Sequence, residues 1–185
     1  MSGRGAAWTL AASTALALFC IGFPARADVS SWVFAGLGPS VQRDSEDVDH
    51  HQTTLQLESG LGAPPDWPVT VGGLFRIQTH FTEGTDLALL TRFATRSFTS
   101  GGWGPALDLG GFRRFWAGHS NGGVGSLVLG APWGITLSLS GFYGDNGARG
   151  ATLALGLDFA RLTVHRTSGL DWFPNPRRPE QASGR

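Results

Sequence analysis

Residues 134–159 read GITLSLSGFYGDNGARGATLALGLDF, two alternating runs on either side of a polar, glycine-containing turn. In both runs an aliphatic residue occupies nearly every second position, and small or polar residues fill the positions between. Successive side chains of a β-strand point to opposite faces, so each run has one apolar face and one small or polar face. We therefore predict two antiparallel strands, 134–144 and 150–159, joined by the turn at 145–149.

The same period of two recurs through the chain, as in TTLQLESGL at 53–61 and again at 69–79. The 28 glycines and the scarcity of sustained helix-forming runs argue against a helical bundle. Longer polar connections fall on one side of the strand series and Gly/Pro turns on the other, as in membrane barrels. We predict an all-β fold, an antiparallel up-and-down transmembrane β-barrel with eight strands at 31–42, 52–62, 68–80, 86–97, 105–116, 123–131, 134–144 and 150–159.

Aromatic residues fall near both ends of these predicted strands, one strand length apart. Two such rings are typical of the interfacial girdles of transmembrane barrels. A soluble β-sandwich or a lipocalin-like binding barrel can also carry aromatic residues at its strand ends, and it remains the alternative. The predicted girdle consists of Trp32, Trp67, Trp103, Trp133 and Phe159 at one end and Phe81, Trp116 and Tyr143 at the other.

The first 27 residues have the pattern of a signal peptide. Arg4 lies near the start, an apolar run covers 11–23, and Ala25-Arg26-Ala27 forms a small-x-small cleavage site. The apolar run is shorter than the roughly 20 residues that a spanning helix needs. We therefore predict export and cleavage after Ala27.

The composition of the exported chain excludes two classes of function. Its only cysteine, Cys20, leaves with the leader, so disulfides and thiolate metal sites are excluded. Loss of Arg4 and Arg26 leaves twelve arginines against fourteen acidic residues, a net charge near −2. A nucleic-acid-binding protein needs a basic surface, so we expect no nucleic-acid partner.

The stretch LALGLDF at 153–159 alternates and ends in an aromatic residue. With the strand pattern over 30–159, it makes the chain resemble the small eight-stranded outer-membrane β-barrel proteins of Gram-negative bacteria. The resemblance implies an outer-membrane location, outer-membrane lipid as partner and no cofactor. It also implies a structural or surface-interaction role through the outer loops rather than an enzymatic one.

The chain departs from that family after Phe159, because RLTVHRT at 161–167 alternates like another short strand. A ninth strand, a ten-stranded barrel and a periplasmic extension are all open, and we favour closure at Phe159. Pro-rich residues such as those of the C-terminal tail bury little apolar surface. The predicted domains are therefore a barrel at 28–167 and a flexible polar tail at 168–185.

Polar residues on the inward faces of the predicted strands would fill the barrel. A lumen bounded by eight strands is only wide enough for side chains, so opposite charges there would pair and leave little channel. A narrow ion or solute path is the alternative. The predicted interior network is Glu58, Arg76, Gln78, Arg92, Arg96 and Asp108.

The stretch HSNGG at 119–123 is similar to the His-x-Ser-Asn stretch of outer-membrane lipid A 3-O-deacylases. The resemblance implies a nucleophile at Ser120 and a base at His119, with Asp145 in place of that family's glutamate. However, adjacent strand residues point to opposite faces, and turns favour Ser, Asn and Gly. We interpret the stretch as a turn, and a deacylase-like esterase is the enzymatic alternative.

A second polar cluster, RDSEDVDHHQ at 43–52, contains carboxylates and imidazoles that can bind divalent cations. Its spacing matches no metal motif, and a solvated loop explains the same residues, so we expect no metal. The candidate ligands are Asp47, Asp49, His50 and His51.

Overall fold

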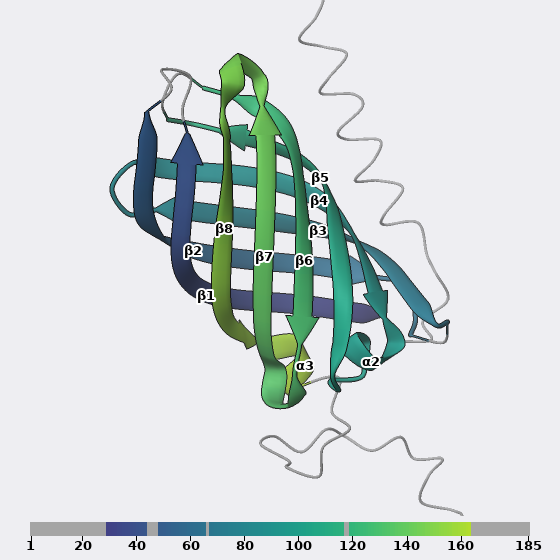
Figure 1. Cartoon of the computed structure of the whole chain (residues 1–185). Helices are drawn as coiled ribbons and strands as arrows, with labels where there is room; N and C mark the ends of the chain where they lie inside the picture. Colours follow the sequence, from purple (N-terminus) through teal and green to yellow (C-terminus); the bar gives the residue numbers. More distant parts are fainter. Residues whose placement is uncertain (1–28, 44–47, 66, 117–118, 164–185) are drawn as a thin grey trace, which may run out of the picture.

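The computed structural model describes residues 29–43, 48–65, 67–116 and 119–163. The predicted signal peptide at 1–27 and tail at 168–185 lie outside the described residues. Eight strands form a single closed barrel, shown in Figure 1. They are β1 (Ser30–Arg43), β2 (Asp49–Gly62), β3 (Val69–His80), β4 (Gly84–Thr95), β5 (Gly104–Arg114), β6 (Asn121–Gly130), β7 (Ile135–Gly144) and β8 (Arg149–Asp158).

Every strand pairs antiparallel with the next along the chain, and β1 also pairs with β8. Phe34 faces Asp158 and Arg43 faces Arg149 across this closing seam. Closure leaves no sheet edge, which removes the unpaired backbone groups that an open sheet would expose. The predicted up-and-down barrel of eight strands is confirmed, with strand ends within three residues of those predicted.

The chain turns into a short helix after β8 instead of adding a strand. Helix α3 (Phe159–Thr163) covers the first residues of the alternating RLTVHRT stretch, and residues 164–167 lie outside the described part. The ten-stranded alternative is therefore wrong for this barrel, because β8 already pairs with β1. None of the helices in the described ranges is long and apolar enough to span a membrane.

The two ends of the barrel differ in their connections. At the loop end, toward the top and left of Figure 1, the chain passes from β1 to β2, β3 to β4, β5 to β6 and β7 to β8. At the turn end lie α2 (Arg96–Thr99), the 3-10 turn η1 (Pro132–Gly134) and α3.

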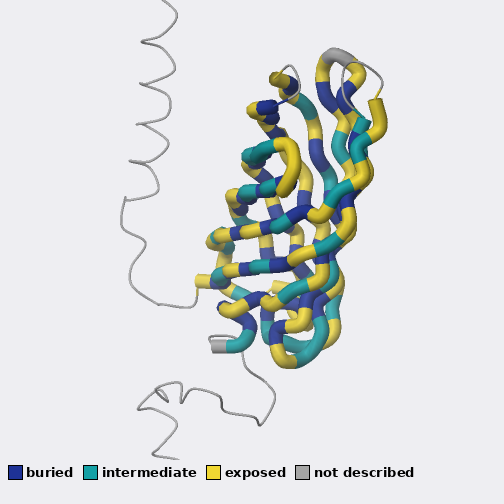
Figure 2. The backbone as a smooth tube through the Cα atoms, turned by 90° about the vertical axis from the view of Figure 1, so that its left-hand side faces the viewer, coloured by how far each residue is buried: buried dark blue, intermediate teal, exposed yellow. Residues whose placement is uncertain are grey.

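One face of each strand is buried and the other is exposed, which gives the alternating colours of Figure 2. All buried strand residues carry even numbers, because each hairpin pairs residues of the same parity. The buried face includes Glu58, Arg76, Gln78, Arg92 and Asp108, which the sequence pattern places inside the barrel.

Arg96 is the exception among the predicted interior residues. Strand β4 ends at Thr95, whose hydroxyl accepts a hydrogen bond from the amide of Phe98 and so caps α2. Arg96 is consequently the exposed first residue of α2 and not part of the lumen. Thr95 can end the strand in this way because its side chain satisfies a free helix amide.

Candidate functional site

The centre of the lumen holds four charged side chains that neutralise one another. Glu58 accepts hydrogen bonds from Arg76 and Arg92 at 2.8 and 2.7 Å, and Asp108 accepts from the same two arginines at 3.2 and 2.7 Å. All four side chains are at most 1% exposed. We call Glu58, Arg76, Arg92 and Asp108 the lumen quartet. Two acids and two arginines make it electrically neutral.

Hydroxyl and amide groups complete the bonding of the quartet. Arg76 donates to Ser126 at 2.7 Å and to Ser140 at 3.1 Å, reaching β6 and β7 across the lumen. Gln56 donates to Glu58 at 2.7 Å. Buried charges are tolerated when partners satisfy them this fully. The quartet therefore ties opposite walls of the barrel together and occupies the middle of the lumen.

A second polar group, nearer the loop end, contains residues that the sequence pattern did not single out. Asp86 accepts hydrogen bonds from the indole of Trp116 at 2.9 Å and from Arg114 at 3.3 Å. His80 lies 3.3 Å from Asp86 and 2.9 Å from the hydroxyl of Thr54. His80 is 1% exposed, so it is a lumen residue.

Trp116 closes this group toward the loop end. Its ring packs against the imidazole of His80 at 5.5 Å and that of His50 at 5.9 Å, and the guanidinium of Arg114 lies 4.1 Å from its centroid. Trp116 is 7% exposed. An aromatic ring packed between two histidines and an arginine leaves little room for solvent to enter.

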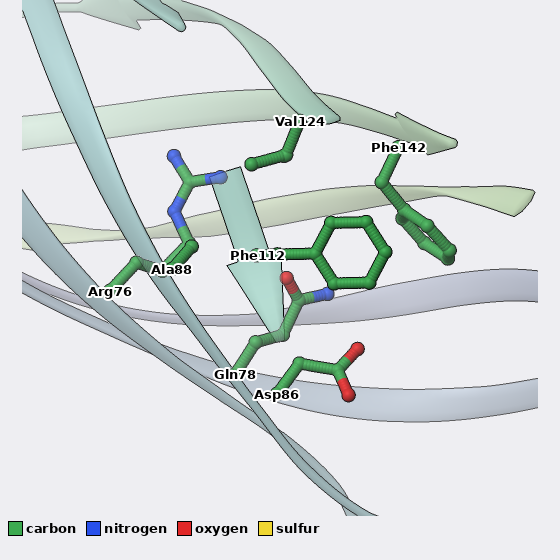
Figure 3. Close-up of a pocket in the computed structure, with 7 residues that line it drawn as sticks. All are labelled: Arg76, Gln78, Asp86, Ala88, Phe112, Val124 and Phe142. Carbon is green, nitrogen blue, oxygen red and sulfur yellow. The ribbon is translucent and has the colours of Figure 1, made fainter. Parts of the chain in front are cut away.

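A small cavity lies between the quartet and the Trp116 group, shown in Figure 3. Its volume is about 10 Å³, roughly the space that one water molecule needs. The polar groups of its lining come from Arg76, Gln78 and Asp86 and the apolar ones from Ala88, Phe112, Val124 and Phe142. This cavity is too small for an organic ligand, since such sites occupy hundreds of Å³.

The turn end of the lumen is filled by Arg161 of α3. Its guanidinium donates to the carbonyls of Phe98 at 2.9 Å and Gly102 at 2.7 Å, and it packs 4.6 Å from the Phe98 ring. A β-carbon added at Gly130 would collide with that guanidinium, which would have to shift. Asp158 accepts the amides of Ala160 and Arg161 at the start of the helix. Polar contacts therefore hold α3 against this end.

Six of the eight predicted girdle residues are exposed on the outside. Trp67 and Trp103 are each 75% exposed, and the other four are at least 47% exposed. Trp32 and Trp116, by contrast, are buried and point inward, so the girdle assignment of these two is corrected. Both carry even numbers and share the buried face of their neighbours, and Arg92 lies 5.5 Å from the ring of Trp32.

The side chains of the neighbouring residues His119 and Ser120 lie in different surroundings. His119 has a positive φ of 59° and is exposed, whereas Ser120 is 2% exposed. The Ser120 hydroxyl donates to Asp145 at 2.7 Å, and Asp145 also accepts the amide of Asn121 at 2.8 Å. These hydrogen bonds, that from Ser120 foremost, hold the pKa of Asp145 below its usual range. Ser120 and Asp145 thus link the β5–β6 connection to the β7–β8 connection. The Ser120 hydroxyl is hydrogen-bonded to a carboxylate and not to the imidazole of His119.

The candidate metal ligands are dispersed in the described part of the chain. Asp49 is bound by Arg43 at 2.7 Å, His50 contacts Glu83 at 3.0 Å, and His51 faces outward. Asp47 lies outside the described residues. Over the described ranges no group of three or more His, Cys, Asp or Glu side chains converges as a metal site.

Sequence reasoning missed His80, Asp86, Arg114 and Arg161 as interior residues. The first three share the even parity of the quartet, so extending the inward face to the strand ends would have found them. Arg161 has no such signal, because it lies in α3 beyond the last strand.

Comparisons with known protein families, with curated proteins and with solved structures find no match to this chain. The architecture therefore rests on the strand pairing described above, and the likeness to lipid A deacylases gains no support from a relative.

Proposed function

We propose that the protein is an outer-membrane β-barrel with a closed lumen and a structural or surface-interaction role. The observation that carries this proposal is the inverted distribution of side chains. Charged and polar groups pair inside the barrel, while leucine, valine, isoleucine and phenylalanine cover its outer wall. Water outside would leave that wall solvated at a cost of roughly 25 cal/mol per Å² of apolar surface. Lipid removes that cost.

The dimensions of the apolar wall support the same proposal. Outward side chains run from Trp133 of η1 through Ile135, Leu137 and Leu139 of β7 to Tyr143. Ten residue steps at about 3.4 Å, on a strand tilted by about 40°, cover a height of roughly 25 Å. That is the height of the apolar band of outer-membrane barrels. The exposed aromatic residues at its two ends are placed as interfacial residues would be.

The closed lumen favours a non-conducting barrel over the lipocalin-like alternative. A lipocalin-like barrel holds its ligand in an interior cavity, whereas the described interior is filled by the quartet, Arg161 and the Trp116 group. An exported barrel of this kind presents only its outer loops to the surroundings. A role in contacts made by those loops is consistent with this arrangement.

The direct test uses the purified exported chain, unfolded in urea and diluted into phosphatidylcholine vesicles. We expect the protein to fold only when vesicles are present and then to migrate on an SDS gel differently before and after boiling. Cell fractionation should place the chain made from the full sequence in the outer membrane. Folding in buffer without lipid, or recovery in the soluble periplasmic fraction, would contradict the proposal.

A further inference from the structure

The charged residues on the outward faces of the described strands all lie at the loop end. They are three arginines, Arg43, Arg113 and Arg149, and one carboxylate, Asp49, with His51 beside them. Towards the turn end the outward strand positions carry apolar, small or hydroxyl side chains. We call Arg43, Arg113 and Arg149 the arginine collar.

The carboxylate of Asp49 is engaged by one arginine. Arg43 donates to its two oxygens at 2.7 and 2.8 Å. Arg149 is the direct cross-strand partner of Arg43, and like charges placed opposite each other on a sheet repel. Among the outward strand residues that the structure describes, the collar therefore has three positive charges against the single carboxylate of Asp49. Glu83 and Asp145 are carboxylates of the loops and do not lie on the outward strand faces; they bond to His50 and Ser120 respectively.

The collar lies at the upper edge of the apolar wall, where aromatic side chains begin. Arg113 stacks on the ring of Phe115 at 5.5 Å, and Arg149 pairs across the strands with Tyr143. Phe115 and Tyr143 are 46% and 67% exposed. In a membrane, this level is that of the lipid headgroups. Arginine binds phosphate oxygens through paired N–H donors.

Across the strands between Arg149 and Arg113, two of the three outward positions are glycines and the third is Tyr143. A row of cross-strand partners runs from Arg149 through Tyr143 and Gly123 to Gly111, two residues before Arg113. A β-carbon added at Gly111 or Gly123 would meet nothing closer than 3.5 Å, so internal crowding does not require glycine there. The open backbone leaves room for a molecule to lie against the wall between the two arginines.

We propose that the arginine collar binds the phosphate of a lipid headgroup, with the wall at Gly111 and Gly123 receiving the adjoining part of that lipid. This inference rests on the proposed membrane function and adds the chemistry of one lipid class to it. Charge complementarity selects an anionic headgroup. The position of the collar at the edge of the apolar wall selects a lipid over a free anion.

The test uses the full exported protein, folded in phosphatidylcholine vesicles and transferred to zwitterionic micelles. Phosphatidic acid is titrated in, and bound lipid is counted by native mass spectrometry. Diacylglycerol, which has the same chains without phosphate, is the matched lipid control. We expect the wild type to bind phosphatidic acid, and Arg113→Gln and Arg149→Gln each to weaken binding by about five-fold.

Two control variants separate the collar from general charge effects. Arg96→Gln removes an exposed arginine at the turn end and should leave binding unchanged. Asp49→Asn removes the outward carboxylate and should tighten binding. Equal binding by the wild type and the Arg113→Gln/Arg149→Gln double variant, both correctly folded, would overturn the inference.

Inorganic phosphate distinguishes the two sources of the anion. Competition by free phosphate as effective as that by phosphatidic acid would show a soluble-anion site and would overturn the lipid assignment. Failure of the wild type to fold in phosphatidylcholine vesicles would count against the proposed function itself. Normal folding with unaltered lipid binding would count against the collar alone.

Discussion

A charge placed on the outer wall at mid-height should reveal what surrounds the barrel. Leu139 on β7 is 52% exposed and lies between Leu127 and Leu153 on the neighbouring strands. It is six residues above Trp133 and four below Tyr143, which places it about 15 Å and about 10 Å from the two aromatic levels. Leu139 is therefore near the middle of the apolar wall.

The expected effect of Leu139→Arg depends on the solvent. In lipid, arginine near the midplane costs about 2 to 4 kcal/mol, which lowers the folding equilibrium constant by about 30-fold to 1000-fold. On a water-exposed surface the same change costs no more than about 0.5 kcal/mol. The loss of folding free energy expected in lipid therefore exceeds that expected in water by more than the error of a urea titration, because an extrapolated free energy is good to about 10 to 15%.

Val48→Arg is the matched control, because Val48 is 48% exposed but precedes β2 at the loop end. Near the interface its cost should be about 0 to 1 kcal/mol. Urea unfolding of both variants from phosphatidylcholine vesicles, followed by tryptophan fluorescence, measures the difference. A loss of stability that is equal at the two positions, or absent at Leu139, would refute the argument that lipid covers this wall.

Three further predictions concern the interior and the loops. Arg92→Met should destabilise the barrel by about 3 to 5 kcal/mol in urea unfolding, because Glu58 and Asp108 lose a buried cationic partner; an unchanged midpoint would show that the quartet is not formed. A chain ended after residue 160 should still close into a barrel but be less stable to heating in SDS than one ended after residue 163, since the carbonyls that Arg161 binds lose their donor; equal stability would contradict a sealing role for Arg161. The lowered pKa of Asp145 means that its carboxylate stabilises the folded loops above pH 3.8, and that this contribution is lost as the pH falls through the lower pKa of the folded state. The backbone amide resonance of Asn121 should therefore titrate below pH 3.8. A midpoint at or above that pH would be inconsistent with the Ser120 contact.

The sequence by itself determined the class of fold, the number of strands and the direction of most side chains. Period-two alternation in segments such as 134–144 and 150–159 is a local property, because strand geometry alone sends adjacent side chains to opposite faces. The inward positions of Glu58, Arg76, Arg92 and Asp108 followed from that alternation. Turn chemistry at Gly- and Pro-rich segments located the strand ends to within a few residues.

Only the tertiary structure decided which of these residues meet and how the ends of the barrel are filled. Pairing across the lumen, such as that of Arg76 with Ser126 and Ser140, depends on closure and register around the whole barrel, which no single strand contains. Trp32 and Trp116 fall near strand ends in the sequence, yet the parity of the hairpins turns both inward. Arg161 became an interior residue because the chain folds back after β1 and β8 close the sheet, leaving backbone carbonyls that a guanidinium can satisfy.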